Sequence, residues 1–543
     1  MLNTKLKLTL ALAALAAVTA LAQTQTTPPA GATSAPPVGA PASPPVAATP
    51  APPPPTAFDK WVKEVKNPTD WLTWGADLRL RNEYFDNALT LGQNVVRHEQ
   101  DYFRFRERLW DSIMPVTNLS INARLATEQR EWMKPSFAKQ YGYRPGMEER
   151  YVILDNANVK WSNALDLPMS ITAGRQDIML GDPLNWWLVC DGTPYDGSWT
   201  MFLDSIRLTG EAKETKTKFD LIYIYQNALP DEWVPTIGRS TDNAARSAPY
   251  TTGSAPYWLT EQNEQGVIFY VANKSIKDTE IDAYFIYKHD SQEGAILSPF
   301  TNSLGAKYPL GDNADIYTIG GKVTGNPFKH WKYSVEGAYQ FGDKQDPTLV
   351  HDNSGVPAGW GNTATRTIDA FGVNSSLTYL FKDRLNNQAS LIFEYLSGDD
   401  PKTTGKDEMF DVLWGRWPRF SELYIYSYPN ETSGKFAQLN NIMRIGPSWS
   451  FSPIKDTTFS AMYNALFAPE ETPTRDMTGT SGANPEQFSR NGNFRGHYIQ
   501  TVLKHKFNDH VSAHLWGEYI WQGDYYSHSD LMTFVRAEVI LTF

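Results

Sequence analysis

The amino-acid sequence predicts an all-β fold, a transmembrane antiparallel β-barrel of about 18 strands with short periplasmic turns and long extracellular loops. Three observations predict it. Apolar and polar residues alternate with period two over many segments of strand length, the connections alternate between short and long, and the chain begins with a secretory signal. A mean hydropathy of −0.44 excludes a helical membrane protein, which needs repeated apolar runs of about 20 residues.

The composition narrows the functional classes. The 543 residues include 49 Lys and Arg against 60 Asp and Glu, a net charge of −11, so we expect no nucleic-acid partner. Aromatic residues make up 13% of the chain. Cys190 is the single cysteine, which excludes a disulfide framework and any multi-cysteine zinc or iron–sulfur site.

Residues 1–22 have the features of a signal peptide. Two lysines precede an apolar run that starts at Leu8, and the segment ends in Ala20-Leu21-Ala22. A membrane anchor is the alternative, but the apolar run is short and is broken by Thr9 and Thr19. We therefore expect cleavage and export from the cytoplasm.

Two segments separate the signal from the barrel. Residues 23–57 form a Pro/Ala-rich linker with 12 of the chain's 36 prolines, a composition that builds no core and predicts a disordered spacer. In 58–72, Phe58, Trp61, Val62 and Val65 follow a loose helical spacing, which predicts a short amphipathic lead-in segment. The barrel is expected over residues 73–543.

Period-two alternation defines the predicted strands. In the first strand Ala76, Leu78 and Leu80 share one face while Arg79 and Arg81 share the other. The predicted spans are 73–85, 100–113, 118–131, 150–162, 168–176, 200–210, 216–226, 265–273, 279–288, 314–324, 331–341, 366–380, 387–396, 436–450, 456–466, 494–507, 510–521 and 530–543.

The connections supply the strongest argument for a barrel in the outer membrane. Connections after even-numbered strands are short and contain turn residues such as Pro115, Asn163 and Pro453. Connections after odd-numbered strands are mostly long, the longest being 227–264 and 397–435. A soluble sandwich or propeller has no reason to segregate its loops in this way. An even strand number places both chain ends in the periplasm.

Aromatic residues gather near the predicted strand ends, where interfacial girdles belong. A ladder of aromatics along which sugars slide is the alternative role. The aromatic residues at these ends are Trp74, Trp110, Trp161, Tyr379, Phe381, Phe451, Phe507, Trp521 and Phe543. We expect the strand that ends in Phe543 to contact the barrel-assembly machinery, and the outer face to contact outer-membrane lipid. Glu107 is the exception, because it shares the predicted lipid face of Phe105 and Leu109.

The predicted lumen face is rich in arginine, with basic residues concentrated in the first three strands. Guanidinium groups stay charged and suit carboxylates and phosphates, so they favour an anionic solute. The alternative is a network in which arginines and lumen carboxylates neutralise each other and brace the barrel. The basic residues on this face include Arg79, Arg81, Arg104, Arg106, Arg108, Arg124, Lys160, Arg207, Arg444 and Arg536, and the acidic residues include Asp77, Glu83, Glu128, Asp220, Glu336, Glu394, Glu518 and Glu538.

The sequence also resembles the alginate-export porins of Gram-negative outer membranes. The resemblance lies in Ile171-Thr172-Ala173-Gly174-Arg175-Gln176-Asp177, in Leu180-Gly181-Asp182 and in Phe202-Leu203-Asp204-Ser205-Ile206-Arg207-Leu208, with arginine-rich strands at 78–81 and 103–108. It extends over 74–543 as an 18-strand pattern and departs in the Pro-rich extension and the Trp186-Trp187…Cys190 insertion. The resemblance implies a channel that exports a polyanionic polysaccharide, and it adds Arg175 to the pore-lining residues.

We therefore predict a monomeric outer-membrane channel that passes an anionic polysaccharide or a small anionic solute. A general or sugar-selective porin and a plugged barrel that acts as an adhesin are the alternatives. We expect no enzymatic activity, no cofactor and no metal, since no catalytic or phosphate-binding motif occurs and His510 and His514 have no obvious third ligand. An outer-membrane hydrolase with a Ser/His pair remains a formal rival.

Overall fold

The fold is described from a computed structural model of the chain. The structure describes residues 56–88, 90–93, 98–134, 147–148, 152–180, 191–192, 202–227, 262–291, 297–301, 307–309, 312–351, 357–362, 364–415, 420–427, 440–471 and 487–543. The chain divides into two compact units, Met1–Val65 and Lys66–Phe543. The predicted signal peptide and nearly all of the predicted linker lie outside the described residues.

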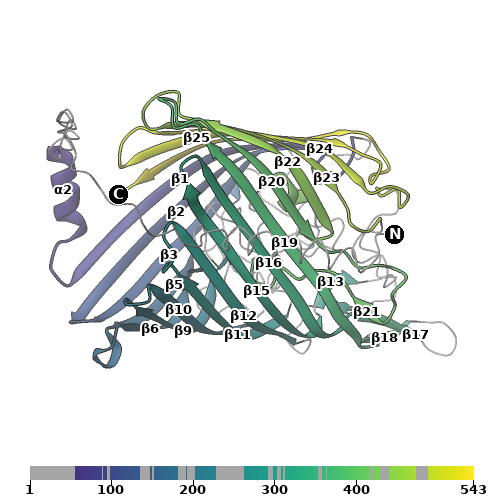
Figure 1. Cartoon of the computed structure of the whole chain (residues 1–543), viewed down its shortest axis with the longest axis horizontal. Helices are drawn as coiled ribbons and strands as arrows, with labels where there is room; N and C mark the ends of the chain where they lie inside the picture. The colour runs from purple at the N-terminus through teal and green to yellow at the C-terminus, as the bar shows by residue number, and fades with distance from the viewer. Residues whose placement is uncertain are drawn as a thin grey trace, which may run out of the picture. The chain divides into compact units, whose positions relative to one another are not determined.

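The second unit is a closed barrel of 18 long antiparallel strands (Figure 1). Each strand pairs with its neighbours along the chain, and β1 pairs with β26 to close the sheet. The first nine strands are β1 (Leu72–Asp86), β2 (Glu99–Val116), β3 (Leu119–Lys134), β5 (Ile153–Ser162), β6 (Met169–Gln176), β9 (Leu203–Ala212), β10 (Thr217–Gln226), β11 (Asn263–Asn273) and β12 (Thr279–Ser291). The remaining nine are β15 (Asn313–Phe328), β16 (Trp331–Gln345), β19 (Arg366–Leu380), β20 (Gln388–Leu396), β22 (Ile442–Phe451), β23 (Thr457–Phe467), β24 (Phe494–Lys506), β25 (Val511–Gln522) and β26 (Leu531–Thr542).

Every predicted strand coincides with one of these strands, which confirms the predicted fold. The largest difference is at 436–450, where the strand begins only at Ile442. Asn441 has a φ of 48°, and its side chain bonds the backbone of Glu470, so strand geometry does not extend through this residue.

The long connections contain short strands. β4 (Met147–Glu148) pairs with β3, and β21 (Lys406–Asp407) pairs in parallel with β19. Three hairpins stand apart from the barrel sheet: β7 (Ile178–Met179) with β8 (Asp191–Gly192), β13 (Leu297–Thr301) with β14 (Lys307–Pro309), and β17 (Pro347–His351) with β18 (Pro357–Asn362). Counted along the 18 barrel strands, these short strands follow the third, fifth, ninth, eleventh and thirteenth, which are labelled β3, β6, β12, β16 and β20. All of them therefore lie in the connections that the sequence predicts to be long.

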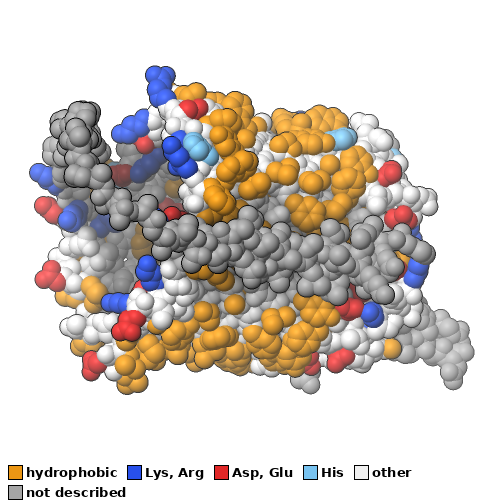
Figure 2. Space-filling view, in the orientation of Figure 1, with side chains coloured by type: hydrophobic (Ala, Val, Ile, Leu, Met, Phe, Trp, Pro, Cys, Tyr) orange, Lys and Arg blue, Asp and Glu red, His pale blue; other side chains and the backbone are white. Residues whose placement is uncertain are grey.

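The two faces of the sheet differ as the alternation predicts. In β1, Leu78 and Leu80 are exposed on the outer face, while Arg79 and Arg81 are buried on the inner face. Figure 2 shows hydrophobic side chains spread over the outside of the strands. Burial by lipid of this apolar exterior, with polar groups turned inward, is the arrangement that a membrane barrel requires.

Left-handed residues form several of the tight turns. Asn118, Asn163, Asp278 and Asp456 have φ between 49° and 67°, and each lies at a short connection. Asn and Asp tolerate this conformation better than other non-glycine residues. The short turns therefore all form at one end of the barrel, which we call the short-turn end.

Aromatic residues ring the outer face at the short-turn end. The ring centroid of Tyr379 is 5.0 Å from that of Trp331 and 5.0 Å from that of Phe381. Trp74 and the terminal Phe543 approach to 5.2 Å where the barrel closes. These contacts fit an interfacial girdle. Trp110 is different, because its alternation places it on the inner face, where its indole packs over Gly75.

Glu107 lies on the outer face of β2, opposite Leu78 of β1 and Thr127 of β3. It is exposed, and Leu109 and Leu125 are exposed on the same face. The exception seen in the sequence is therefore a real feature of the surface.

The first unit contains one described helix, α2 (Ala57–Lys66). Thr56 caps it, since its hydroxyl accepts the Asp59 backbone N–H at 3.1 Å. Phe58 and Trp61 are about half exposed on the apolar side of the helix. Within the described part of the chain, no helix is long and apolar enough to span a bilayer.

Candidate functional site

A network of charged side chains lines the inner face where β26, β1, β2 and β3 adjoin. We call it the arginine wall. Among the described residues it contains Arg79, Arg81, Arg104, Arg106, Arg108, Arg130 and Arg536, together with Asp77, Glu83, Glu128, Glu422 and Glu538. It brings together the five arginines predicted on the first two strands.

The register of the strands creates the wall. Alternation aims Arg79 and Arg81 inward from β1, and the direct cross-strand partners of these residues on β2 are Arg106 and Arg104. Like charges placed opposite each other repel, so the fold must supply carboxylates between them. Glu83 and Glu128 do this, because both contact Arg104, at 3.0 and 2.6 Å.

Most of the carboxylates in the wall are shared. Glu83 contacts Arg81, Arg104 and Arg536, and Glu128 contacts Arg79, Arg104 and Arg130. This sharing leaves seven guanidinium groups with five carboxylates among the described members of the wall. Each shared carboxylate therefore braces two or three guanidinium groups of neighbouring strands.

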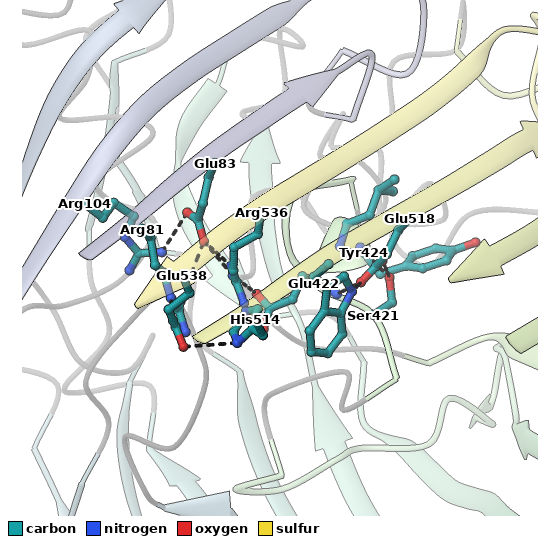
Figure 3. A network of polar contacts seen from close by, with 12 residues as sticks. Arg81, Glu83, Arg104, Ser421, Glu422, Tyr424, His514, Glu518, Arg536 and Glu538 are labelled. Carbon is teal, nitrogen blue, oxygen red and sulfur yellow. Dashed lines mark hydrogen bonds and ion pairs between the residues drawn. The ribbon is translucent and has the colours of Figure 1, made fainter. Parts of the chain in front are cut away.

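The seam of the barrel passes through this network. Arg81 on β1 forms an ion pair with Glu538 on β26, and Arg536 donates through Nε to Glu83 at 2.7 Å. His514 on β25 approaches Glu538 at 3.2 Å. Figure 3 shows these contacts side by side. The first and last strands are thus joined by charge as well as by backbone hydrogen bonds.

Three of the other predicted arginines also face the lumen, each beside its own acid. Arg124 bonds Asp155 at 2.7 Å and Asp177 at 2.8 Å, and Arg207 bonds Asp220 at 2.7 Å. Arg444 pairs with Glu394. The structure places these three outside the arginine wall.

Arg175 is placed differently from the other predicted arginines. It pairs with Asp204 at 2.9 Å and follows Gly174, whose φ is 119°. By alternation it shares a face with Ala173 and Ile206, and Ile206 is 54% exposed on the outer side of the sheet. The structure therefore does not group Arg175 with the arginines that face the lumen.

A segment between β20 and β22 folds into the lumen, where the sequence predicts an external loop over 397–435. We call its described residues, 409–415 and 420–427, the lumen strap. Phe410, Leu413, Trp414 and Tyr424 are fully buried, and Phe420 is almost so. Part of this long connection thus turns into the lumen, because these apolar side chains gain more from burial among the inward-facing residues than from exposure.

The strap contacts strands on well-separated parts of the inner face of the barrel. Its backbone at Asp411 exchanges two hydrogen bonds with Gln340 of β16, at 2.7 and 2.8 Å. Trp414 lies against Gly266 of β11, where a Cβ would be 2.6 Å from the indole. After the undescribed residues 416–419, the Phe420 carbonyl accepts a bond from Tyr498 of β24 at 2.9 Å.

The second half of the strap is held by two charged residues on the inner face of the barrel, Glu518 and Arg536. Glu518 of β25 accepts hydrogen bonds from the Ser421 hydroxyl and from the backbone N–H groups of Glu422 and Leu423, at 2.6, 2.8 and 3.1 Å. These bonds lie at the start of α4 (Leu423–Ser427). Arg536 of β26 donates to the Glu422 carboxylate at 2.8 Å (Figure 3).

Four lysines also project inward nearer the short-turn end. Lys160, Lys218, Lys332 and Lys504 belong to β5, β10, β16 and β24 and alternate with outward-facing residues. Among the residues that the structure describes, none of the four has a carboxylate oxygen within 4.0 Å. The sequence predicts Lys160 on the lumen face, and the other three lysines were not among the predicted residues.

Comparison with known families identifies the chain. The model of the family described as "Alginate export" matches residues 242–538, more than half of the sequence. The protein belongs to the alginate export family. Its barrel and its family together make it an outer-membrane channel, and they confirm the resemblance drawn from the sequence. The matched range begins after the Gly-Arg-Gln motif at 174–176 that suggested it.

Three outer-membrane porins are among the solved structures whose backbone resembles that of this chain. OccK5 (OpdH) and OprD of Pseudomonas aeruginosa are each 10% identical, with TM-scores of 0.47 and 0.46, covering 87% of this chain and 98% and 95% of theirs. OccAB3 of Acinetobacter baumannii is 9% identical, with a TM-score of 0.46, covering 87% and 99%. These are distant likenesses, and the strand pairing of this alginate export family member defines its fold. No curated protein matches the sequence.

Several residues of the site were missing from the arginine-based prediction. Glu422 and Ser421 lie in the connection assigned to the exterior, and Arg130 lies at the end of a predicted strand. One signal was available. Val412-Leu413-Trp414 and Leu423-Tyr424-Ile425-Tyr426 are hydrophobic runs within a long connection of this alginate export family member, and such runs favour burial.

Proposed function

We propose that this protein passes an anionic polysaccharide or another anionic solute across the outer membrane, through a lumen lined by arginine. The observation that carries the proposal is the grouping of arginines on the inner face of four adjoining strands, β26, β1, β2 and β3. In a narrow aqueous lumen bounded by a low-dielectric wall, a cluster of cations concentrates anions and focuses the field.

The exposed cations support the same direction of selectivity. Arg108 and Arg207 keep about a fifth of their side-chain surface accessible, and the four lumen lysines face no close carboxylate among the described residues. The net charge of −11 does not oppose this, because acidic residues also gather in the connections, as at Asp399, Asp400 and Glu408. We further propose that the short turns face the periplasm, where the N-terminal linker would then lie.

The test is the reversal potential of the purified protein in planar bilayers under a salt gradient. Wild type should prefer anions, and the preference should weaken between 0.1 M and 1 M salt as the screening length falls from about 10 Å to about 3 Å. Arg104→Glu with Arg106→Glu should reduce or invert it. Arg108→Gln with Arg207→Gln is a milder pair at more exposed positions, for the case that the first pair does not fold.

The matched control is Lys213→Glu with Lys216→Glu, which makes the same change in charge in the exposed turn between β9 and β10. It should leave selectivity close to wild type. A cation-preferring wild type, or wall variants that behave like this control, would mean that the arginines only brace the barrel.

A plugged barrel is the second candidate, and the buried lumen strap is the observation that favours it. Single-channel conductance separates the two functions. A wild-type protein that folds and inserts but never conducts would support an adhesin or structural barrel. A lipase assay on the same sample tests the remaining enzymatic alternative.

A further inference from the structure

Arg536 binds two carboxylates that differ in how they are attached. Glu83 is on the neighbouring strand β1, where backbone pairing fixes it. Glu422 is on the lumen strap, where its backbone N–H bonds Glu518 of the adjacent strand β25, and its carboxylate lies 2.8 Å from Arg536. Arg536 is completely buried, and Phe534 lies beneath its guanidinium at 5.1 Å. A planar guanidinium with two ordered carboxylates is a preformed carboxylate site.

We propose that Arg536 is a carboxylate-binding site of the lumen, that Glu422 is its internal occupant, and that a carboxylate of the transported anion displaces Glu422 and thereby releases the strap. This proposal rests on the proposed function and names how that lumen is regulated. Exchange of one carboxylate for another keeps the charge pair, so displacement avoids leaving Arg536 buried beside an unfilled partner position.

The need to displace Glu422 also determines which anions can bind Arg536. A group tethered by a short segment acts at an effective concentration on the order of mM, and Glu518 holds the strap further in place through three hydrogen bonds from residues 421–423. A single uronic acid is a poor competitor at lower concentrations. A chain with a carboxylate on each sugar contacts several cations of the arginine wall at once, so it gains the advantage of multivalency.

Glu422 and Glu518 make separable contributions. Glu422→Gln removes the internal carboxylate and leaves the backbone N–H of residue 422 on Glu518. Glu518→Gln loosens the backbone of the strap and leaves Arg536 and its wall partner in place. Both changes vacate the same site by different routes, so both should make Arg536 easier for an added anion to reach. Arg536→Gln removes the site itself and should weaken binding of the anion.

The experiment measures block of single-channel current in planar bilayers by hexagalacturonate, with galacturonate as the monovalent probe and maltohexaose as the neutral one. Heat-modifiable mobility first confirms that each full-length variant is folded. The half-blocking concentration of hexagalacturonate should fall at least tenfold in Glu422→Gln and in Glu518→Gln, and should rise in Arg536→Gln. Maltohexaose should block all of them equally and weakly.

Glu408→Gln is the matched control, since it makes the same change in the same connection, where the carboxylate accepts a bond from Thr403 instead of from an arginine. It should stay within twofold of wild type. If both strap variants fold, remain anion-selective and block within twofold of wild type, displacement is wrong while the anion channel stands. If Glu422→Gln does not fold, Glu518→Gln decides. Cation selectivity in every protein would overturn both proposals.

Discussion

Glu128 is the residue whose removal most directly tests how the arginine wall is held together. Its carboxylate lies 2.6 Å from Arg104, 3.2 Å from Arg79 and 4.0 Å from Arg130, and 5% of its side chain is exposed. In Glu128→Gln these guanidinium groups remain close together without that negative charge. Breaking a buried ion pair by removing one partner costs about 3–5 kcal/mol.

The assay is guanidinium unfolding of the folded protein in lipid vesicles, followed by heat-modifiable mobility. We expect Glu128→Gln to lower the free energy of unfolding by about 3–5 kcal/mol, or about two to four powers of ten in the folded-to-unfolded ratio. Glu131→Gln, on the same strand and the opposite face, should change it by about 0.5 kcal/mol or less. Adding Arg104→Gln to Glu128→Gln should recover about 0.5–3 kcal/mol, because the two residues are coupled. Equal effects of Glu128→Gln and Glu131→Gln would refute the reasoning and mean that water screens the wall.

Three further predictions follow from other parts of the chain. Gly342→Ala should destabilise the barrel by about 1–3 kcal/mol in the same assay. The φ of Gly342 is 139°, and a Cβ there would clash with the carbonyl oxygen of Asp315 on β15. Gly405→Ala is the control and should have little effect, since no atom lies within 4 Å of the added Cβ. Burial, reinforced by the nearby Asp407 carboxylate, raises the pKa of Asp399 to about 6. A carboxyl-resolved NMR titration should show that midpoint, and Asp407→Asn should lower it. The connection should become more stable as pH falls through 6, because the folded state then binds a proton that the unfolded chain does not yet take up; a midpoint near 4 would contradict this. Deletion of 28–55 should leave insertion into vesicles intact, since a spacer without an apolar face contributes little to folding, and loss of insertion would show a specific role.

The strands were predictable because their causes are local. A period of two, a left-handed turn residue such as Asn118 or Asn163, and the length of the connection are all visible in a short stretch of sequence. The inner face of β1 followed from the same periodicity. What the periodicity does not contain is the partner of each arginine, because Arg81 and Glu538 are 457 positions apart and meet only through closure of the sheet.

The lumen strap and Arg175 were not predictable in this way. The path of a connection depends on where its apolar side chains can be buried. Trp414 is buried against Gly266 of β11, which is far away in the sequence. Arg175 follows Gly174, whose backbone geometry is rare for other residues, and its face depends on the cross-strand register with Asp204. The assignment of Arg175 to the pore came from the family resemblance alone, whereas the pairing of β6 with β9 puts it on the face of Ala173 and Ile206.

The ion pairs across the seam have a consequence for biogenesis. Arg81 and Glu83 lie on the first strand to be made, and their partners Glu538 and Arg536 lie on the last. A truncated or unfinished chain therefore keeps buried-type charges without neutralising partners and cannot complete the sheet. Only a chain that includes β26 can neutralise Arg81 and Glu83 of β1, so closure of the sheet and pairing of these charges occur together. Chains without β26 should stay open and be available to periplasmic proteases.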